Sequence, residues 1–174
     1  MALTIITLVR HGQAEHNVTR NFLVHDTSLT PLGETQCHEL SKEFPSKPPV
    51  DLLVSSPLKR TIQTTLLGFK KQVESGVKVE LLAELQEASE VPCDTGSSRG
   101  DLEKEELFKG LDFSGLPDDW TSEASYASPS SLRGRMLMLT GIRKENGPRI
   151  LVPLANVGES PANGSSLDRK AMLS

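Results

Sequence analysis

The chain opens with an apolar run that ends in an arginine, a histidine and a glycine. Residues 3–9 are rich in Leu, Ile and Val, as is typical of a strand buried on both faces of a parallel sheet. Arg10, His11 and Gly12 follow this run directly. Open α/β sheets bind ligands at the carboxyl ends of their strands, and a glycine lets the backbone turn sharply and approach a ligand closely. The pattern therefore predicts a strand over residues 3–9 that leads into a ligand site.

Strands and helices are expected to alternate through the first half of the chain. Two further apolar runs, residues 50–55 and 77–82, predict buried strands. A helix is expected before each of them, because Thr30 and Ser56 are both followed by a proline. That pair is typical of the N-cap and first position of a helix. The order of elements predicts an α/β fold with a mostly parallel sheet flanked by helices.

The second half of the chain has weaker patterns. Residues 101–111 are highly charged and predict a helix, and Ser128 with the proline after it predicts another. Residues 149–152 predict a fourth strand. Pro153 lacks the N–H group that a central strand would donate, so this strand is expected to end before it.

The residues after the fourth predicted strand differ in composition from the rest. They consist largely of Gly, Ser, Asn, Pro and charged residues, which offer little apolar surface to bury. A chain of 174 residues is long enough for one domain. We therefore expect one domain over residues 1–152 and a disordered tail over residues 153–174.

Charge and cysteine content exclude several classes of function. The formal net charge is −4, with no run of Lys or Arg that favours nucleic acid or an acidic membrane. No apolar run approaches the ~18 residues of a membrane span, and the apolar start is too short for a secretion signal. Cys37 and Cys93 are far apart, which favours neither a zinc site nor a disulfide framework. We therefore expect a cytoplasmic protein that binds no metal, nucleic acid or membrane.

Arg10 and His11 together suit the chemistry of phosphate esters. A guanidinium group binds two phosphate oxygens at once, and an imidazole can attack phosphorus to form a covalent intermediate. Because the chain as a whole is mildly acidic, the positive charge must be local to such a site. The pair therefore predicts a pocket for a small phosphorylated substrate.

Three segments resemble the motifs of one enzyme family. They are residues 8–17, residues 29–36 and residues 55–64. In this order they resemble the signature of the histidine phosphatase superfamily, the phosphoglycerate mutase-like proteins. The resemblance covers residues 3–152 and implies the phosphoglycerate mutase-like architecture of a mostly parallel sheet flanked by helices.

The resemblance also assigns roles to individual residues. His11 matches the histidine that attacks phosphorus and becomes phosphorylated. Arg10, Arg60 and Asn17 match residues that contact the phosphate, and Glu87 falls where the family carries the acid that protonates the leaving group. The implied function is hydrolysis of phosphomonoesters through a phosphohistidine, without a metal or any other cofactor.

One residue that the family uses is missing. A second catalytic histidine is expected in a His-Gly pair at the end of the strand that begins near Arg149, yet no histidine occurs after His38. Losing one preorganised electrostatic group typically lowers a rate by about 10²–10³-fold. The alternative is therefore a catalytically impaired pseudophosphatase, or a truncated gene product, that only binds phosphorylated ligands. In both cases the C-terminal part of the domain is expected to be missing.

A histidine that attacks phosphorus must be neutral and in a fixed tautomer. An acceptor must hold the ring nitrogen of His11 that does not attack, and we expect a backbone carbonyl such as that of Asn17. His16 is interpreted as a structural loop residue rather than as a catalyst.

Overall fold

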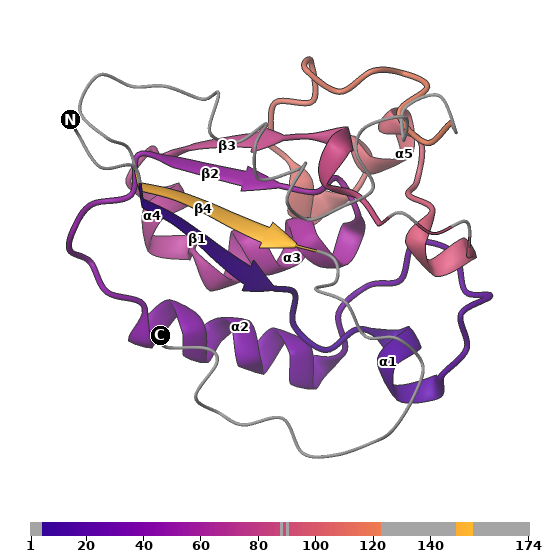
Figure 1. Ribbon diagram of the computed structural model, residues 1–174, viewed down its shortest axis with the longest axis horizontal. Helices are drawn as coiled ribbons and strands as arrows, with labels where there is room; N and C mark the ends of the chain where they lie inside the picture. The colour runs from indigo at the N-terminus through magenta and orange to yellow at the C-terminus, as the bar shows by residue number, and fades with distance from the viewer. Residues whose placement is uncertain (1–4, 88, 90, 123–148, 155–174) are drawn as a thin grey trace.

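The computed structural model describes residues 5–87, 89, 91–122 and 149–154. These residues contain a four-stranded sheet in the order β1-β4-β2-β3 (Figure 1). The strands are β1 (Ile5–Arg10), β2 (Leu52–Ser55), β3 (Lys78–Leu81) and β4 (Arg149–Leu154). All neighbouring pairs are parallel. The predicted α/β fold with a parallel sheet is therefore confirmed for the described residues.

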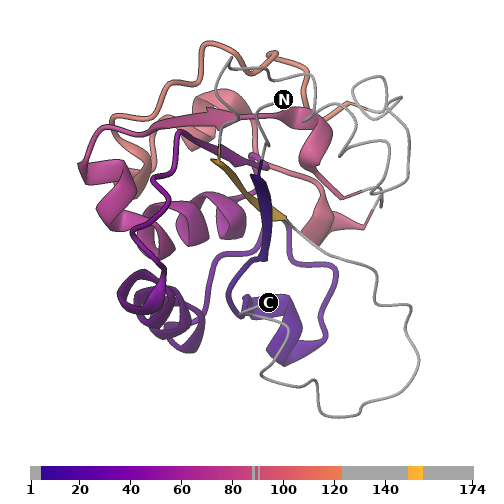
Figure 2. The same cartoon turned by 60° about the vertical axis from the view of Figure 1, so that its left-hand side comes forward.

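The longest described helices lie side by side on one face of the sheet (Figures 1 and 2). They are α2 (Pro31–Glu43) and α3 (Lys59–Gly68), and α3 is followed by the short helix α4 (Lys70–Glu74). Two more short helices, α1 (Glu15–Thr19) and α5 (Arg99–Leu102), lie beyond the carboxyl ends of the strands. No helix in the described part of the chain is long and apolar enough to cross a membrane.

The sheet buries side chains on both of its faces. Leu53 on β2 packs into the larger core cluster with Ile62 of α3 and Phe69. Its neighbours Leu52 and Val54 point to the opposite face, where they form a second cluster with Leu85 and Val152. Alternate residues of one strand therefore enter two cores, as the consecutive apolar residues within 50–55 predicted.

Helix α2 begins as its sequence predicted. The Thr30 hydroxyl accepts a hydrogen bond from the Gly33 amide at 3.1 Å, and Pro31 occupies the first helical position. Gly33 and Cys37 are buried on the side facing the rest of the molecule. The cap and the buried stripe confirm the expected helix.

Helix α3 begins differently from the prediction. It starts at Lys59, and its N-cap residue Leu58 has no side-chain oxygen to offer. The Asp26 carboxylate instead accepts a hydrogen bond from the Lys59 amide at 3.0 Å, and its second oxygen accepts one from the Ser97 amide at 2.8 Å. The predicted cap at Ser56 is therefore wrong, because a buried carboxylate from another loop replaces it and also anchors a third segment.

The predicted charged helix over residues 101–111 is also wrong. The chain forms only α5 and a 3-10 turn, Glu106–Phe108, in this region. Leu102 and Phe108 are both buried in the core. Residues six apart on a continuous helix point in different directions, so the helix must break for both side chains to reach the same core. The helix predicted from Ser128 lies outside the described residues.

The fourth strand extends past its proline. β4 lies between β1 and β2, and it pairs with β1 as far as Arg10 and Leu154. Its pairing with β2 ends at Leu151, two residues before Pro153. The proline therefore fits in β4, because β2 no longer pairs with β4 at Pro153 and needs no hydrogen bond from it. The predicted disordered tail is therefore wrong for Pro153 and Leu154, which belong to β4, and its remainder lies outside the described residues from 155 onward.

A glycine contact joins the start of α2 to the segment after β1. A methyl group at Gly33 would overlap the carbonyl oxygen of Gln13, whereas one at Gly100 would meet no atom within 4 Å. We expect Gly33→Ala to lower the free energy of unfolding by more than about 2 kcal/mol, because the clash is with backbone. Gly100→Ala, within α5, is the matched control and should change it by less than about 0.5 kcal/mol. Urea unfolding of both variants checks this, and equal stabilities would contradict the contact.

Candidate active site

The carboxyl edge of the sheet gathers most of the residues that the sequence singled out. β1 ends at Arg10, and His11 follows it. β2 ends at Ser55 and leads to Arg60 in the first turn of α3. Glu87 follows the turn Ala83–Leu85 that continues β3. In Figure 1 the strand arrows point toward this edge, where α1 and α5 lie.

His11 is held in one tautomer by its neighbour. The side chain is 5% exposed, and its Nδ1 lies 2.6 Å from the carbonyl oxygen of Gly12. A carbonyl oxygen can only accept, so Nδ1 carries the proton and Nε2 carries the lone pair. The expected acceptor, the carbonyl of Asn17, is therefore corrected to that of Gly12. Nε2 is the nitrogen of His11 that is able to attack a ligand.

The backbone after β1 is fastened to α3. The Gly12 amide donates to the Thr64 hydroxyl at 3.1 Å, and that hydroxyl donates to the Arg60 carbonyl at 2.7 Å. A methyl group at Gly12 would come within 2.7 Å of the Gly33 carbonyl oxygen. A glycine is therefore needed at this position for α2 to pack closely against the segment after β1.

His11 is neutral because it is buried among positive charges. Its pKa is lowered from 6.5 to about 3, chiefly by burial and then by the charges of Arg60, Arg10 and His16, and the hydrogen bond to Gly12 opposes the shift only in part. An imidazole with this pKa carries a free lone pair throughout the neutral range. The site therefore contains a neutral imidazole whose Nε2 carries an available lone pair.

Arg60 is a buried cation with a partly satisfied guanidinium group. Its side chain is 1% exposed. One terminal nitrogen donates to the Cys93 carbonyl at 2.5 Å, and the other donates to the Asp94 carboxylate at 2.9 Å. Its Nε–H group is buried and has no hydrogen-bond partner among the residues that the structure describes. A buried positive charge thus retains a donor that an anion would satisfy.

Asp94 is a residue that the sequence reasoning missed. Its carboxylate pairs with Arg60 from a 3-10 turn, Pro92–Asp94, which lies far from α3 in sequence. No spacing rule links the two residues. The available signal was indirect, since a buried arginine requires a counter-ion to offset its desolvation.

The other predicted site residues differ in exposure and in their relation to His11. Arg10 has an exposed side chain at the end of β1, and its charge lowers the pKa of both His11 and His16. Asn17 lies in α1 with an exposed side chain. Glu87 is half-buried at the same edge of the sheet. The structure thus brings Arg10 and Arg60 into the electrostatic surroundings of His11, and it places Glu87 at the same edge of the sheet.

His16 is more closely integrated into the site than the sequence indicated. It lies in α1 rather than in a loop, it is buried, and its ring centre is 6.0 Å from that of His11. Its Nδ1 lies 2.6 Å from the Thr27 hydroxyl. Burial and the charge of Arg60 lower its pKa to about 4, against the opposing effect of Asp94. A histidine five residues after His11 on a predicted turn was the signal that could have identified it.

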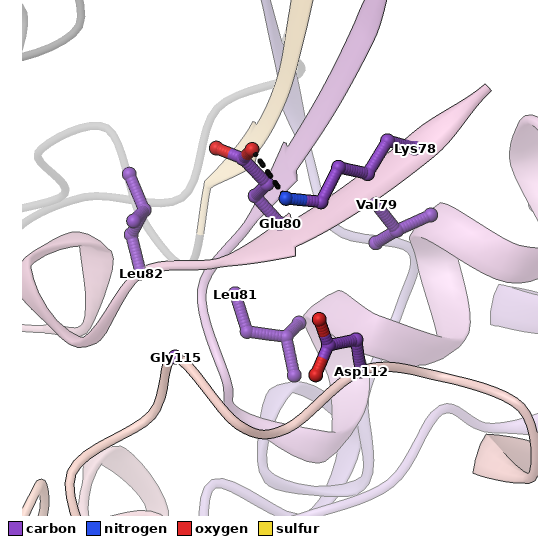
Figure 3. A pocket seen from close by; sticks show the side chains of 7 residues that line it. All are labelled: Lys78, Val79, Glu80, Leu81, Leu82, Asp112 and Gly115. Atoms are coloured by element: carbon purple, nitrogen blue, oxygen red, sulfur yellow. Dashed lines mark hydrogen bonds and ion pairs between the residues drawn. The ribbon is translucent and has the colours of Figure 1, made fainter.

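A small pocket of about 140 Å³ lies elsewhere, along strand β3 (Figure 3). Lys78 and Glu80 form an ion pair of 2.9 Å on the strand, and Asp112 faces it from a loop. Its lining residues are Lys78, Val79, Glu80, Leu81, Leu82, Asp112 and Gly115. None of them belongs to the residues around His11, so this pocket does not extend the candidate site.

Sequence comparison finds relatives that are phosphatases. The chain is 33% identical over 118 residues to a probable phosphatase of Schizosaccharomyces pombe, which covers 66% of this chain and 54% of that protein. It is 40% identical over 82 residues to a broad-specificity phosphatase of Saccharomyces cerevisiae, which covers 46% of this chain and 36% of that protein. The chain therefore matches about half or less of the length of these curated relatives.

Structural comparison supports the same relationship. A phosphoserine phosphatase from Entamoeba histolytica, solved with 3-phosphoglyceric acid, is 26% identical with a TM-score of 0.50, over 88% of this chain and 75% of that one. A phosphoglycerate mutase from Bacillus anthracis shares the fold, at 17% identity and a TM-score of 0.55 over 88% and 75% of the two chains. Residues 6–152, which include the arginine–histidine–glycine segment, match the family described as the histidine phosphatase superfamily (branch 1). The chain belongs to the histidine phosphatase superfamily (branch 1).

Proposed function

We propose that this protein hydrolyses small phosphomonoesters through a phosphohistidine at His11. The observation that carries the proposal is a neutral, buried imidazole with a free Nε2 within the field of a buried arginine. Within the described part of the chain, the Nε–H group of Arg60 has no hydrogen-bond partner, and leaving such a donor buried costs about 1–3 kcal/mol. A phosphate oxygen would satisfy it and offset the buried charge.

The proposed reaction has two balanced steps. Nε2 of His11 attacks phosphorus, the bond from phosphorus to the ester oxygen breaks, and Glu87 transfers a proton to the departing alcohol. Water then attacks the phosphohistidine, the phosphorus–nitrogen bond breaks, and the Glu87 carboxylate takes a proton from that water. Throughout both steps, the hydrogen bond from Nδ1 to the Gly12 carbonyl keeps the ring oriented.

Arg10, Arg60 and Asn17 are proposed to hold the transferring phosphoryl group. Phosphoryl transfer depends chiefly on positioning and on neutralising the charge of the phosphate oxygens. The two guanidinium groups supply that charge, so the proposal includes no metal. Hydrolysis is favoured over transfer between substrates because the curated relatives are phosphatases. The free, buried cysteines Cys37 and Cys93 support a reducing, cytoplasmic location.

One observation favours a second candidate, a protein that binds phosphorylated ligands without turning them over. The family match ends at residue 152, and no histidine occurs among residues 39–174. β4 runs beside β1 as far as Leu154 opposite Arg10, and the family resemblance implies a second histidine close to this point. In this second candidate, Arg10 and Arg60 still bind the phosphate but no phosphoryl transfer follows, as expected for a truncated or divergent member of the family.

Release of phosphate from an aryl phosphate distinguishes the two candidates. We expect turnover by the wild-type chain, no turnover by His11→Ala, and wild-type turnover by His38→Ala, which removes an exposed histidine of α2. Arg60→Gln should lower kcat/KM at least about 100-fold, because it removes a buried charge from the phosphate.

Each failure has a distinct meaning. A folded wild-type chain that binds inorganic phosphate but releases none from the ester would support the binding protein. A folded chain that neither binds nor releases phosphate would contradict both candidates.

The neutral state of His11 that this mechanism requires has a consequence for stability. Its pKa is about 3 in the folded protein, against an ordinary 6.5. Below pH 6.5 the unfolded chain therefore binds a proton that the folded chain excludes. The free energy of unfolding should fall as the pH decreases from 6.5 toward 3, with a contribution from His11 that approaches about 1.4 kcal/mol per pH unit.

Urea unfolding between about pH 7 and pH 5 measures this contribution. His11→Asn should show a shallower fall in stability than the wild type, since it removes the titrating group. His38→Asn is the matched control and should keep the wild-type slope. Equal slopes for the wild type and His11→Asn would show that His11 is not held neutral.

A further inference from the structure

A chain of three side chains connects the loop before α2 to the predicted phosphate ligand Asn17. The Thr27 hydroxyl lies 2.6 Å from Nδ1 of His16, and Nε2 of His16 lies 3.0 Å from Nδ2 of Asn17. At the far end, Oδ1 of Asn17 accepts a hydrogen bond from the Ala14 amide at 2.9 Å. We refer to Thr27, His16 and Asn17 as the Thr27–His16–Asn17 chain.

The Ala14 amide determines the direction of every hydrogen bond in this chain. A backbone N–H group can only donate, so the atom of Asn17 that faces it must be the amide oxygen. The amide nitrogen of Asn17 then faces His16 and donates to its Nε2. A neutral imidazole with an accepting Nε2 carries its proton on Nδ1, which donates to the Thr27 hydroxyl.

This arrangement leaves one donor of Asn17 uncommitted to the chain. The amide nitrogen carries two hydrogens, and His16 uses one of them. Because both ends of the amide are held, the second hydrogen has a fixed direction. Asn17 is exposed while His16 and Thr27 are buried, at 4% and 1% exposure. The buried part of the chain therefore fixes the amide of an exposed residue that still has one donor to offer.

We propose that His16 is a positioning residue that holds the Asn17 amide ready to donate to the phosphate of the substrate. The inference rests on the proposed function, since it gives His16 a task at the same phosphate site. His16 itself need not touch the substrate. It needs to remain neutral, and its lowered pKa, about 4, agrees with that requirement. A proton on Nε2 would face the Asn17 amide donor and break the chain.

A purely structural role for His16 predicts a different response to substitution. His16→Phe keeps an aromatic ring of similar size but removes the acceptor for Asn17 and the donor for Thr27. His16→Gln restores a polar group that can accept from Asn17. If His16 only fills space, phenylalanine should serve at least as well as glutamine.

The experiment measures the dissociation constant for inorganic phosphate by calorimetry, with the folded state of each variant checked by circular dichroism. We expect His16→Phe to weaken binding about tenfold, since one aimed hydrogen bond to an anion is lost. His16→Gln should stay within about threefold of the wild type, and His38→Phe, on the exposed side of α2, should match it.

A double-mutant cycle with Asn17→Ala separates positioning from general damage. Once the amide is absent there is nothing for His16 to position, so His16→Phe combined with Asn17→Ala should bind phosphate as Asn17→Ala does alone. If His16→Phe fails to fold, Thr27→Val replaces it in the cycle, because it releases the other end of the ring. That variant should weaken binding at least threefold, and only when Asn17 is present.

The outcomes distinguish this inference from the proposed function. Phosphate binding by the wild type with no change in His16→Phe would overturn the positioning role alone. An effect of the same size in the Asn17→Ala background would also overturn it, in favour of a structural role. A folded wild type that does not bind phosphate would overturn the proposed function, and the positioning role with it.

Discussion

The buried charge of Arg60 is the constraint on which the rest of the site depends. Taking a cation out of water costs several kcal/mol, and the fold offsets this cost with the Asp94 carboxylate and the Cys93 carbonyl. After burial, which is the larger cause, the same charge is the next to lower the pKa of His11 and of His16. Arg60 thus favours the neutral form of both histidines and supplies a positive charge that would attract an anion. The Asp26 carboxylate accepts hydrogen bonds from the first amide of α3 and from the Ser97 amide. It thereby holds the start of the helix that carries Arg60 next to the segment that follows Asp94.

Local patterns were sufficient for the frame of the fold. Apolar runs were enough to predict the strand before Arg10 and the parallel orientation of the strands, and the Thr30-Pro31 pair was enough to predict the start of α2. These signals act within a few residues of the chain. The site residues on β1 could be proposed for the same reason, since His11 must follow the strand that places it. The family resemblance added Arg60 and Asn17 in motif order.

Contacts between distant segments could not be predicted in this way. Asp26 caps α3 across 33 residues of sequence, and Asp94 reaches Arg60 across 34. No periodicity marks either residue, because each acts on a partner that only the folded chain brings near. The break between Leu102 and Phe108 has the same origin, since the shared core overrides the helical pattern of that segment. His16 was underestimated because its importance comes from Thr27 and Asn17 rather than from its position in the sequence.

The central claim is that His11 receives the phosphoryl group on Nε2, because Nδ1 is committed to the Gly12 carbonyl. The most direct measurement is phosphorus NMR of the chain, quenched in alkali during incubation with an aryl phosphate, combined with mass spectrometry of the peptide that contains His11. Phosphohistidine survives alkali, and its two isomers give different resonances. The account predicts a single phosphoryl group on Nε2 of His11. A phosphoryl group on Nδ1, on another residue, or on none at all would contradict it.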